Sequence, residues 1–443
     1  MSAKTLTQGG SSGVLYSDRR DFYIRPNVVK ELWTDVTPFT TVVSNRGVVS
    51  GLADPTYKMF EHRNPWQKQE FNFNASVTIQ DDKAQSSTVD IDGAVGLGGT
   101  ATLADQSWVG LQVDIWNAAK DTKKGSAIIT TVASDGTTIN LKNLSGAAND
   151  NSDDISVVDG DFGIVVGNAH GEGTESPEAW ADELEVVYNT CQIFKTPLQI
   201  TGTLLEASLR GESSELARLR DIKSQEHNIQ KERAFLFGRN PYGLSGSFGN
   251  LEDMTDGSTV SGNVLRATMG IIPAIESHGY ASGDNQNRFS ISEASYAYGN
   301  FVDDMEKVFQ YVPEAGVKRA FCGMGAMSYW SKMAGSSGLA GNSGWTVNLG
   351  DMKRDSLGFN YRVLESPHGA LQLIPTPALR GPYNKYMLVV SDENLSLMQY
   401  RAPKFQANIK QDNAYDGVKD QYFSDEGIGV TLIESHKLFT IGD

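Results

Sequence analysis

The segment Phe321–Met327, FCGMGAM, has the residue types and the position that a phosphate-binding turn needs. Its Gly-x-Gly pair stands between a predicted buried strand and a predicted helix, where backbone N–H groups can hold a phosphate. The third glycine of the dinucleotide-binding fingerprint is absent, because Ser328 stands in its place, and no acidic residue follows at the expected distance. We interpret the segment as a tight strand-to-helix turn and predict no cofactor.

Metal chemistry has equally little support. The segments VDIDG (89–93) and DDISVVDGD (153–161) resemble fragments of calcium loops, but neither has the ligand spacing of an EF-hand. Asp and Gly also favour turns, so we predict turns there, with a weak structural cation as the alternative. The six histidines are widely spaced and form no zinc-binding motif. They are His62, His170, His227, His278, His368 and His436. The sequence predicts no metal site.

Catalytic constellations are also missing. The segment GLSGS (243–247) lacks the order G-x-S-x-G of a nucleophile elbow, and no phosphate-binding G-x-x-x-x-G-K-S/T occurs. Carboxylates are numerous, but no pattern pairs two of them across a predicted cleft, as a glycosidase requires. We therefore predict no catalytic residue and a function that is not enzymatic.

The whole chain has the composition of a folded protein. It has 443 residues, 39% hydrophobic and 21% charged, which predicts two or three domains with substantial cores. Cys191 and Cys322 are expected to be buried and reduced. The first residues contain no apolar run that would predict a signal peptide or a membrane span. We expect synthesis in the cytoplasm and no membrane partner.

The net charge of −16 is concentrated in one region. Residues 81–185 contain 19 acidic and 5 basic side chains, whereas the first 80 residues are slightly basic. Tight binding to nucleic acid requires clusters of lysine and arginine at the phosphates. We therefore predict no sequence-specific DNA binding, although an acidic protein surface allows DNA to lie nearby without binding to it.

The first half of the chain predicts an arm, a β-ribbon and an inserted β-domain. Residues 1–50 resemble an extended arm, with a flexible stretch at 9–13, a short helix at 26–33 and a β-rich piece, TPFTTVVSNR, at 37–46. Strand-like residues at 55–75 and 183–202 flank a module at about 76–168 with short β runs. Asp135-Gly136 predicts a hairpin within it. Four to six such strands predict a small barrel or sandwich inserted at the tip of the ribbon.

One long helix is predicted to follow the ribbon, over 203–237. Thr203 and Glu206 form a capping box at its start, and Gly238 is expected to end it in the left-handed conformation. An apolar stripe is predicted at Leu205, Leu209, Leu216, Leu219, Ile222 and Ile229. Charged side chains, Lys231 and Glu232 among them, are placed off that stripe. Further helices are predicted at 263–278, kinked at Pro273, and at 292–311, and strands dominate from 345. The fold class is α+β.

This order of parts resembles the major capsid proteins of tailed bacteriophages with the HK97 fold, in the branch with a β-domain inserted in the extended loop. The resemblance is carried by TPFTTVVS (37–44), VYNTCQIFKTPLQITGT (187–203), KERAFLFG (231–238) and GVTLIESHKLFTI (429–441). It implies an N-terminal arm (1–50), an extended loop (51–202) with an inserted barrel at about 76–168, a spine helix (203–238), a mixed α/β axial domain (239–360) and returning strands of the peripheral domain (361–443).

The resemblance implies a subunit that forms pentamers and hexamers of an icosahedral shell around packaged double-stranded DNA. Its location would be the virion, with separate scaffold, portal and cement proteins as further partners. No residue pair marks the covalent Lys–Asn crosslink that some relatives form. Two alternatives remain open at this point: another structural virion protein, such as a tail-tube or decoration protein, and a β-rich carbohydrate-active enzyme.

Overall fold

The computed structural model describes residues 37–62, 70–82, 85–92, 108–134, 136–145, 152–176, 184–206, 214–240, 265–282, 285–311, 316–335, 348–409 and 416–442. They form two compact units: unit 2 is Phe60–Glu185, and unit 1 is the chain before and after it. The helix predicted at 26–33, the segment 243–247 and the side chains of Leu209 and Asp135 lie outside the described residues. Within the described residues, no helix is long and apolar enough to cross a membrane.

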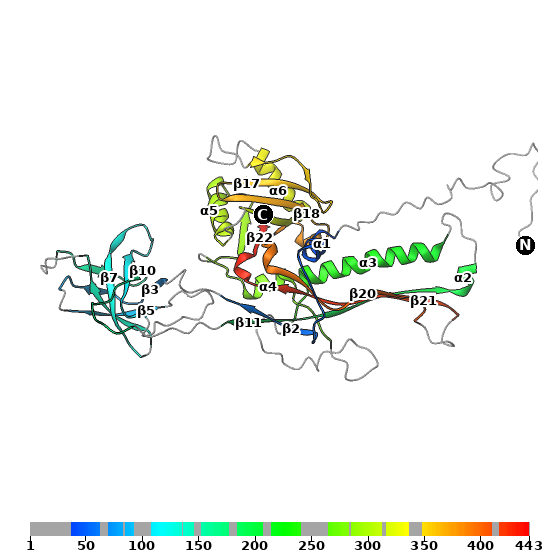
Figure 1. Cartoon of the computed structure of the whole chain (residues 1–443). Helices are drawn as coiled ribbons and strands as arrows, with labels where there is room; N and C mark the ends of the chain where they lie inside the picture. Colours follow the sequence, from blue (N-terminus) through cyan, green and yellow to red (C-terminus); the bar gives the residue numbers. More distant parts are fainter. Residues whose placement is uncertain are drawn as a thin grey trace, which may run out of the picture. The chain divides into compact units, whose positions relative to one another are not determined.

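Unit 2 contains a small closed β-barrel in the strand order β10-β3-β5-β8-β7-β6 (Figure 1). Burial alternates along these strands, and the inward side chains include Val113, Ile115 and Ile129, as expected when one face of each strand lines a core. The predicted β-domain is thus a barrel. The strands are β3 (Glu70–Phe73), β5 (Ser87–Asp92), β6 (Leu111–Trp116), β7 (Lys123–Val132), β8 (Thr138–Asn143) and β10 (Phe162–Asn168), with β4 (Val77–Ile79) and β9 (Ile155–Val157) as a separate pair.

The predicted hairpin within the barrel is confirmed. Strands β7 and β8 pair antiparallel, with Val132 opposite Ile139. Gly136 in the connection has a φ of 68°, a left-handed conformation that glycine adopts without steric cost. The chain enters unit 2 along β2 (Thr56–Glu61) and returns along β11 (Glu185–Thr190), which pair with each other.

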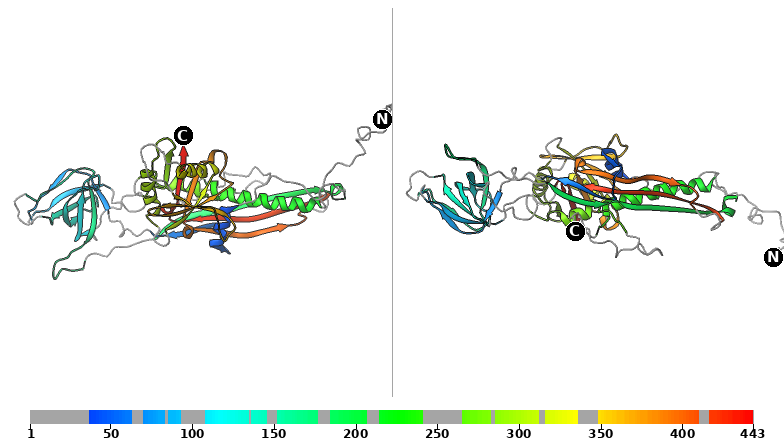
Figure 2. Two further views of the ribbon diagram at one scale, coloured as in Figure 1. Left: turned by 90° about the horizontal axis from the view of Figure 1, so that it is seen from above. Right: turned by 60° about the horizontal axis from the view of Figure 1, so that its bottom comes forward.

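Unit 1 contains a four-stranded sheet in the order β1-β20-β21-β12. The long strands β12 and β21 pair over ten residues, from Gln192 opposite Glu426 to Thr201 opposite Gly417. Helix α3 runs along this sheet (Figures 1 and 2). The elements are β1 (Val48–Ser50), β12 (Gln192–Thr201), β20 (Leu395–Gln406), β21 (Gly417–Val430), α1 (Pro38–Arg46), α2 (Gly202–Glu206), α3 (Glu215–Phe237) and α4 (Ile271–His278).

A second, mixed sheet completes unit 1, in the order β13-β22-β19-β14-β18-β17-β15, with β16 on β17. One core on this sheet joins Phe301, Met305 and Trp330. The other core joins Phe39, Phe235 and Phe321. The elements are β13 (Arg288–Ser292), α5 (Tyr298–Phe309), β14 (Val317–Cys322), α6 (Met324–Gly335), β15 (Asn348–Leu349), β16 (Lys353–Arg354), β17 (Asn360–Ser366), β18 (Gly369–Pro375), β19 (Tyr386–Val390), β22 (Lys437–Gly442) and the 3-10 turns η5 (Gly381–Tyr383), η6 (Asp392–Asn394) and η7 (Ile433–Ser435).

The β-rich piece predicted at 37–46 is wrong, because these residues form helix α1. Pro38 occupies the start of the helix, where its missing N–H costs no hydrogen bond. Phe39, Val42 and Val43 are then spaced to share one helical face, and all three are buried in the core of unit 1. Burial of this face outweighs the β-propensity of the threonines and valines.

The single long helix predicted over 203–237 is also wrong at its start. The backbone of Ser214 is extended, with φ −150° and ψ 103°, and its Oγ accepts the N–H of Ala217. Helix α3 therefore begins at Glu215. The predicted Thr203 cap is wrong as well, because the short helix α2 already begins at Gly202, and the Thr201 hydroxyl accepts the N–H of Leu204 at 3.4 Å. Residues 207–213 between the two helices lie outside the described part of the chain.

The predicted end of α3 is right, but the predicted reason is not. Gly238 follows the last helical residue with φ −56°, so it is not left-handed. Glycine is needed there for space: a Cβ would lie 2.4 Å from the Ala234 carbonyl oxygen and 2.6 Å from that of Thr268. The close approach brings the end of α3 against the segment before α4.

Two later helices are shorter than predicted. Helix α4 begins at Ile271, so Pro273 lies in its first turn, where a missing N–H breaks no helical bond and causes no kink. Residues 288–292 form strand β13 beside β22, and helix α5 begins only at Tyr298. The strand-to-helix order of β14 and α6 is confirmed.

Candidate functional site

The side of α3 that faces the four-stranded sheet carries a row of polar side chains, which we call the polar layer. On β12 the helix-facing positions alternate with exposed ones and include Phe194 and Thr196. Each helical member contacts a partner on β12 or β21. The polar layer consists of Thr196, Arg220, His227, Lys231, Asp420, Ser424 and Glu426.

His227 lies at the centre of the polar layer. Its Nδ1 is 3.0 Å from Thr196 Oγ1 and its Nε2 is 3.0 Å from Ser424 Oγ. Burial, assisted by the charge of Lys231, lowers the pKa of His227 to about 4, so the ring is neutral at physiological pH. A neutral imidazole has one donor and one acceptor, which two hydroxyl groups can satisfy.

The contact between His227 and Ser424 does not form a nucleophile. Catalytic serine–histidine pairs need a substrate-accessible hydroxyl and a group that orients the base. Ser424 is fully buried and His227 is 4% exposed. The second partner of His227 is the Thr196 hydroxyl, not a carboxylate. The arrangement can therefore fix α3 on the sheet, but it offers no reacting atom to a substrate.

Two ion pairs flank His227. Lys231 Nζ lies 3.1 Å from Glu426 Oε2, and both side chains are almost completely buried. Gln399 donates to the other oxygen of Glu426 at 3.0 Å. Nearer the start of α3, Arg220 donates to Asp420 Oδ2 through Nε at 2.8 Å and Nη2 at 2.7 Å. Buried charges need such pairing, because an isolated one is costly to desolvate.

Glu232 joins α3 to α1. Its Oε2 accepts the backbone N–H of Thr40 at 3.2 Å, in the first turn of α1, where N–H groups lack helical partners. Its Oε1 is buried and has no hydrogen-bond partner among the described residues. Burial raises the pKa of Glu232 to about 7, although the Thr40 N–H opposes the shift.

We expect Glu232→Gln to remove a pH dependence of stability. The pKa of the Glu232 carboxyl is about 7 in the folded protein, above its ordinary value of 4.5. As the pH rises, this carboxyl therefore ionises in the unfolded chain before it ionises in the folded protein. Stability is then lost between about pH 4.5 and 7, by on the order of 3 kcal/mol. Urea unfolding of the wild type and of the variant should give similar stabilities near pH 4.5, and the variant should be the more stable of the two at pH 8.

The control for this prediction is Glu226→Gln, also on α3. The Glu226 carboxylate is 34% exposed and pairs with Lys223, so its removal should change stability by less than about 1 kcal/mol at either pH. A Glu232→Gln variant that loses stability with rising pH as steeply as the wild type would contradict the assignment.

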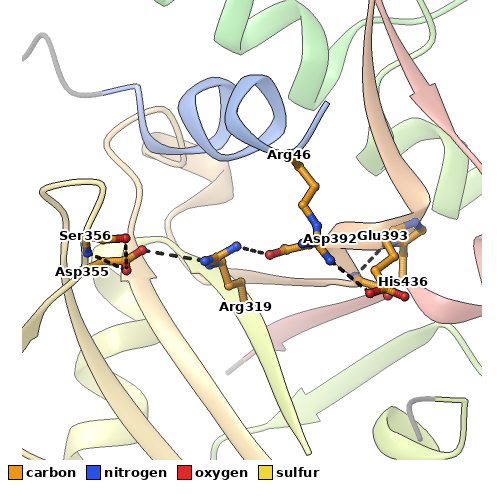
Figure 3. A network of polar contacts seen from close by, with 8 residues as sticks. Arg46, Arg319, Asp355, Ser356, Asp392, Glu393 and His436 are labelled. Carbon is orange, nitrogen blue, oxygen red and sulfur yellow. Dashed lines mark hydrogen bonds and ion pairs between the residues drawn. The ribbon is translucent and has the colours of Figure 1, made fainter. Parts of the chain in front are cut away.

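A second polar network lies where α1 meets the mixed sheet (Figure 3). Arg319 on β14 pairs with Asp392 and lies 3.8 Å from Asp355, and Arg46 on α1 lies 3.0 Å from Glu393. Burial raises the pKa of Asp392, and the charge of Arg319 only partly offsets this. The network connects α1, β14, η6 and the segment after β16.

The structure gives FCGMGAM the predicted structural role. Asn384 occupies the start of α6: its carbonyl accepts the N–H of Ala326 at 3.1 Å, and its Oδ1 accepts that of Gly325 at 3.0 Å. A Cβ on Gly323 would lie 2.2 Å from the Asn384 carbonyl oxygen. The N–H groups that would hold a phosphate are therefore used internally, and the segment is a tight turn.

The two calcium-like segments differ from each other. DDISVVDGD contains a turn at Gly160, with φ 88°, and Asp161 accepts from Val158 N–H and pairs with Lys124. In VDIDG, predicted as a turn, residues 89–92 instead lie in strand β5, where Asp90 accepts a hydrogen bond from the Thr138 hydroxyl, and Gly93 lies outside the described residues. Across the described ranges, no group of three or more His, Cys, Asp or Glu side chains is placed to hold a metal ion.

Both cysteines are free and buried, as predicted. Burial raises the pKa of Cys191 to about 12 and raises that of Cys322 as well, so both thiols stay protonated. The largest omission of the sequence interpretation is the polar layer. Its Lys231 is buried, whereas the stripe residues predicted to be buried on α3 are only partly so, namely Leu216, Leu219, Ile222 and Ile229. The sequence signal of the polar layer is the spacing of His227, Lys231 and Phe235, four residues apart on one helical face.

The comparisons with known proteins agree with the non-enzymatic interpretation. Residues 24–428 match the family model described as SU10 major capsid protein. No curated protein matches the chain at a significant level. Similar solved structures include the capsid of a native GTA particle (8% identity, TM-score 0.44, 98% of this chain and 99% of that chain), one from Mycobacterium phage Bobi (10%, 0.42, 98% and 100%) and one from Microbacterium phage Oxtober96 (10%, 0.43, 97% and 99%).

The family match covers most of the sequence and includes both units. It confirms the resemblance to phage major capsid proteins and makes the protein a structural component of the virion that assembles with copies of itself. The tail-tube, decoration and carbohydrate-active alternatives are thereby set aside. The chain belongs to the SU10 major capsid protein family and is a phage major capsid protein.

Proposed function

We propose that identical copies of this chain form pentamers and hexamers, which close into the icosahedral head around packaged double-stranded DNA. The family match carries the proposal. Identical subunits that repeat one heterologous contact generate closed rings. The polar layer supports a mechanical role, because it fixes a 23-residue helix along two long strands and makes unit 1 resistant to bending.

We also propose a division of labour along the chain. Residues 1–50 act as an arm, 51–202 as an extended loop with its barrel at about 76–168, and the spine helix up to 238 as the support of the peripheral domain. The axial domain, drawn from the sequence as 239–360, is extended in this proposal to β17, β18, β19 and β22 of 361–443. Its support is the mixed sheet, in which β22 pairs with β13, β18 and β19 pair with β14, and β17 pairs with β18.

Electron microscopy of the protein expressed alone, after size fractionation, tests the proposed assembly. We expect polyhedral shells or rings of five and six subunits in negative stain. Separate scaffold, portal and cement proteins remain proposed partners, so a monomeric sample calls for co-expression with the scaffold of the same phage. A protein that stays monomeric in both experiments would contradict the proposal.

Deletion of residues 2–30 should leave a folded subunit that assembles poorly. The described core begins with α1, after the deleted stretch, and α1 contributes Phe39, Val42 and Val43 to it. Arms of this kind raise the local concentration of neighbouring contacts. Circular dichroism should be unchanged while the yield of shells falls by about tenfold or more. Normal shell yield from the deletion variant would disprove the arm hypothesis.

A further inference from the structure

The face of the four-stranded sheet that points away from α3 carries a cluster of cationic side chains around Phe423. Lys195 and Lys404 lie directly opposite Phe423 in the sheet register, and directly opposed residues of antiparallel strands share a face. Lys419 precedes Phe423 by four residues on the same strand and therefore shares its face. We call this surface the basic face, and it consists of Lys195, Arg401, Lys404, Lys419 and Phe423.

Two cations of the basic face lie against an aromatic ring. Arg401 Cζ lies 4.4 Å and Lys404 Nζ 5.6 Å from the centroid of Phe423, within the range of cation–π attraction. Phe423 is only 6% exposed, whereas Lys195, Arg401 and Lys404 are exposed. The side-chain stems cover the ring, and the charged groups reach solvent.

The charge of the basic face is only partly neutralised. Asp425 lies on the same face, but it is fully buried and already pairs with Arg401 at 3.0 Å and Arg266 at 3.3 Å. The other carboxylates of β21, Asp420 and Glu426, point to α3 and pair there. In the part of the chain that the structure describes, no ion pair is formed by Lys195, Lys404 or Lys419.

Unit 2 carries a strong negative charge, opposite in sign to the charge of the basic face. Residues 81–185, which form the greater part of unit 2, hold 19 acidic and 5 basic residues and account for −14 of the net charge of −16. All five basic residues are lysines. Two of them already form ion pairs, Lys123 with Asp114 and Lys124 with Asp161. Exposed carboxylates in the described part of unit 2 include Asp90, Asp121, Asp153, Asp159, Glu172 and Glu175.

We propose that the basic face of one copy binds the acidic surface of unit 2 of a neighbouring copy in the shell. This inference rests on the proposed function, because it needs copies to meet in a fixed orientation. Each exposed ion pair contributes little, but the contact repeats in every copy and steers association. Packaged DNA is the competing occupant of the basic face, and the −16 charge of each copy opposes it.

Charge reversal with complementation between chains tests the proposal. The face variant carries Lys195→Glu and Lys404→Glu, and the unit 2 variant carries Glu172→Lys and Glu175→Lys. We expect each variant alone to raise the protein concentration needed for assembly by about tenfold. An equimolar mixture of the two should recover part of the loss, because opposite charges meet only where the two variants are neighbours. Wild-type assembly should weaken as salt rises from about 50 to about 500 mM.

The control variant, Lys332→Glu with Lys353→Glu, makes the same charge change at exposed positions outside the basic face and should assemble like the wild type. Circular dichroism verifies that each variant is folded, and recovery in the mixture excludes a folding defect. Recovery only when all four changes are in one chain would overturn the proposal in favour of a contact within the subunit. Normal shells from the face variant would overturn it too, and normal shells with reduced DNA content would assign the face to DNA. Failure of the wild type to assemble would instead count against the proposed function.

Discussion

Lys231→Met should lower the free energy of unfolding of the unassembled subunit by about 3–5 kcal/mol. The substitution preserves most of the side-chain volume but leaves Glu426 without the ammonium group 3.1 Å away, in a site where its side chain is 1% exposed. Among the residues that the structure describes, only Gln399 would still donate a hydrogen bond to this carboxylate. Urea unfolding followed by tryptophan fluorescence measures the difference.

Two variants separate this effect from a general loss of charge on α3. Lys223→Met removes the partner of Glu226 on the same helix, but that pair is about one-third exposed on both sides and should cost less than about 1 kcal/mol. The double variant Lys231→Met with Glu426→Gln should regain part of the lost stability, since no buried charge remains unpaired. Equal losses for Lys231→Met and Lys223→Met would show that the polar layer is not energetically special.

Asn189→Leu is expected to destabilise the subunit by about 4 kcal/mol, because it leaves several buried backbone N–H and carbonyl groups without a hydrogen-bond partner. Asn189 is fully buried at the end of β11. Its Nδ2 donates to the carbonyls of Met269 at 3.1 Å and Ile428 at 2.9 Å, and its Oδ1 accepts the N–H of Met269 at 2.9 Å and of Thr190 at 2.8 Å. One side chain thus joins β11, β21 and the segment before α4.

The neighbouring Thr190→Val is the matched control. Thr190 is equally buried, but its hydroxyl makes one bond to the described backbone, to the Ala267 carbonyl at 2.7 Å, so the loss should be about 1 kcal/mol. Both variants should be compared by urea unfolding at the same pH. If Asn189→Leu costs no more than Thr190→Val, the bridging role of Asn189 is refuted.

The sequence predicts the barrel well because its signal is local. Alternating burial along β6 and β7 follows from side chains that point to opposite faces of a strand. The connection before β8 carries glycine where a positive φ is needed. The strand-to-helix turn at Gly323 is predicted for the same reason, since strand, glycines and helix are consecutive in sequence.

The errors have a common physical origin in contacts between distant segments. Helix α1 forms because Phe39, Val42 and Val43 find a core contributed by residues up to about 400 positions away. Lys231 looks solvent-exposed until β21 supplies Glu426. Gly238 is required by a carbonyl of Thr268, thirty residues later. None of these partners can be identified from the local pattern, and for this reason the sequence does not predict the polar layer.

Strand β22, near the end of the sequence, lies between β13 and β19 in the mixed sheet, and its Phe439 stacks on Phe289 at 4.5 Å. A nascent chain cannot close this sheet until the ribosome has made residues 437–442, whereas unit 2 is continuous in sequence and can fold much earlier. A prematurely terminated chain therefore has a gap in the middle of a sheet instead of a missing edge. We expect a subunit that lacks residues 437–442 to leave the facing edges of β13 and β19 unpaired, which exposes it to aggregation.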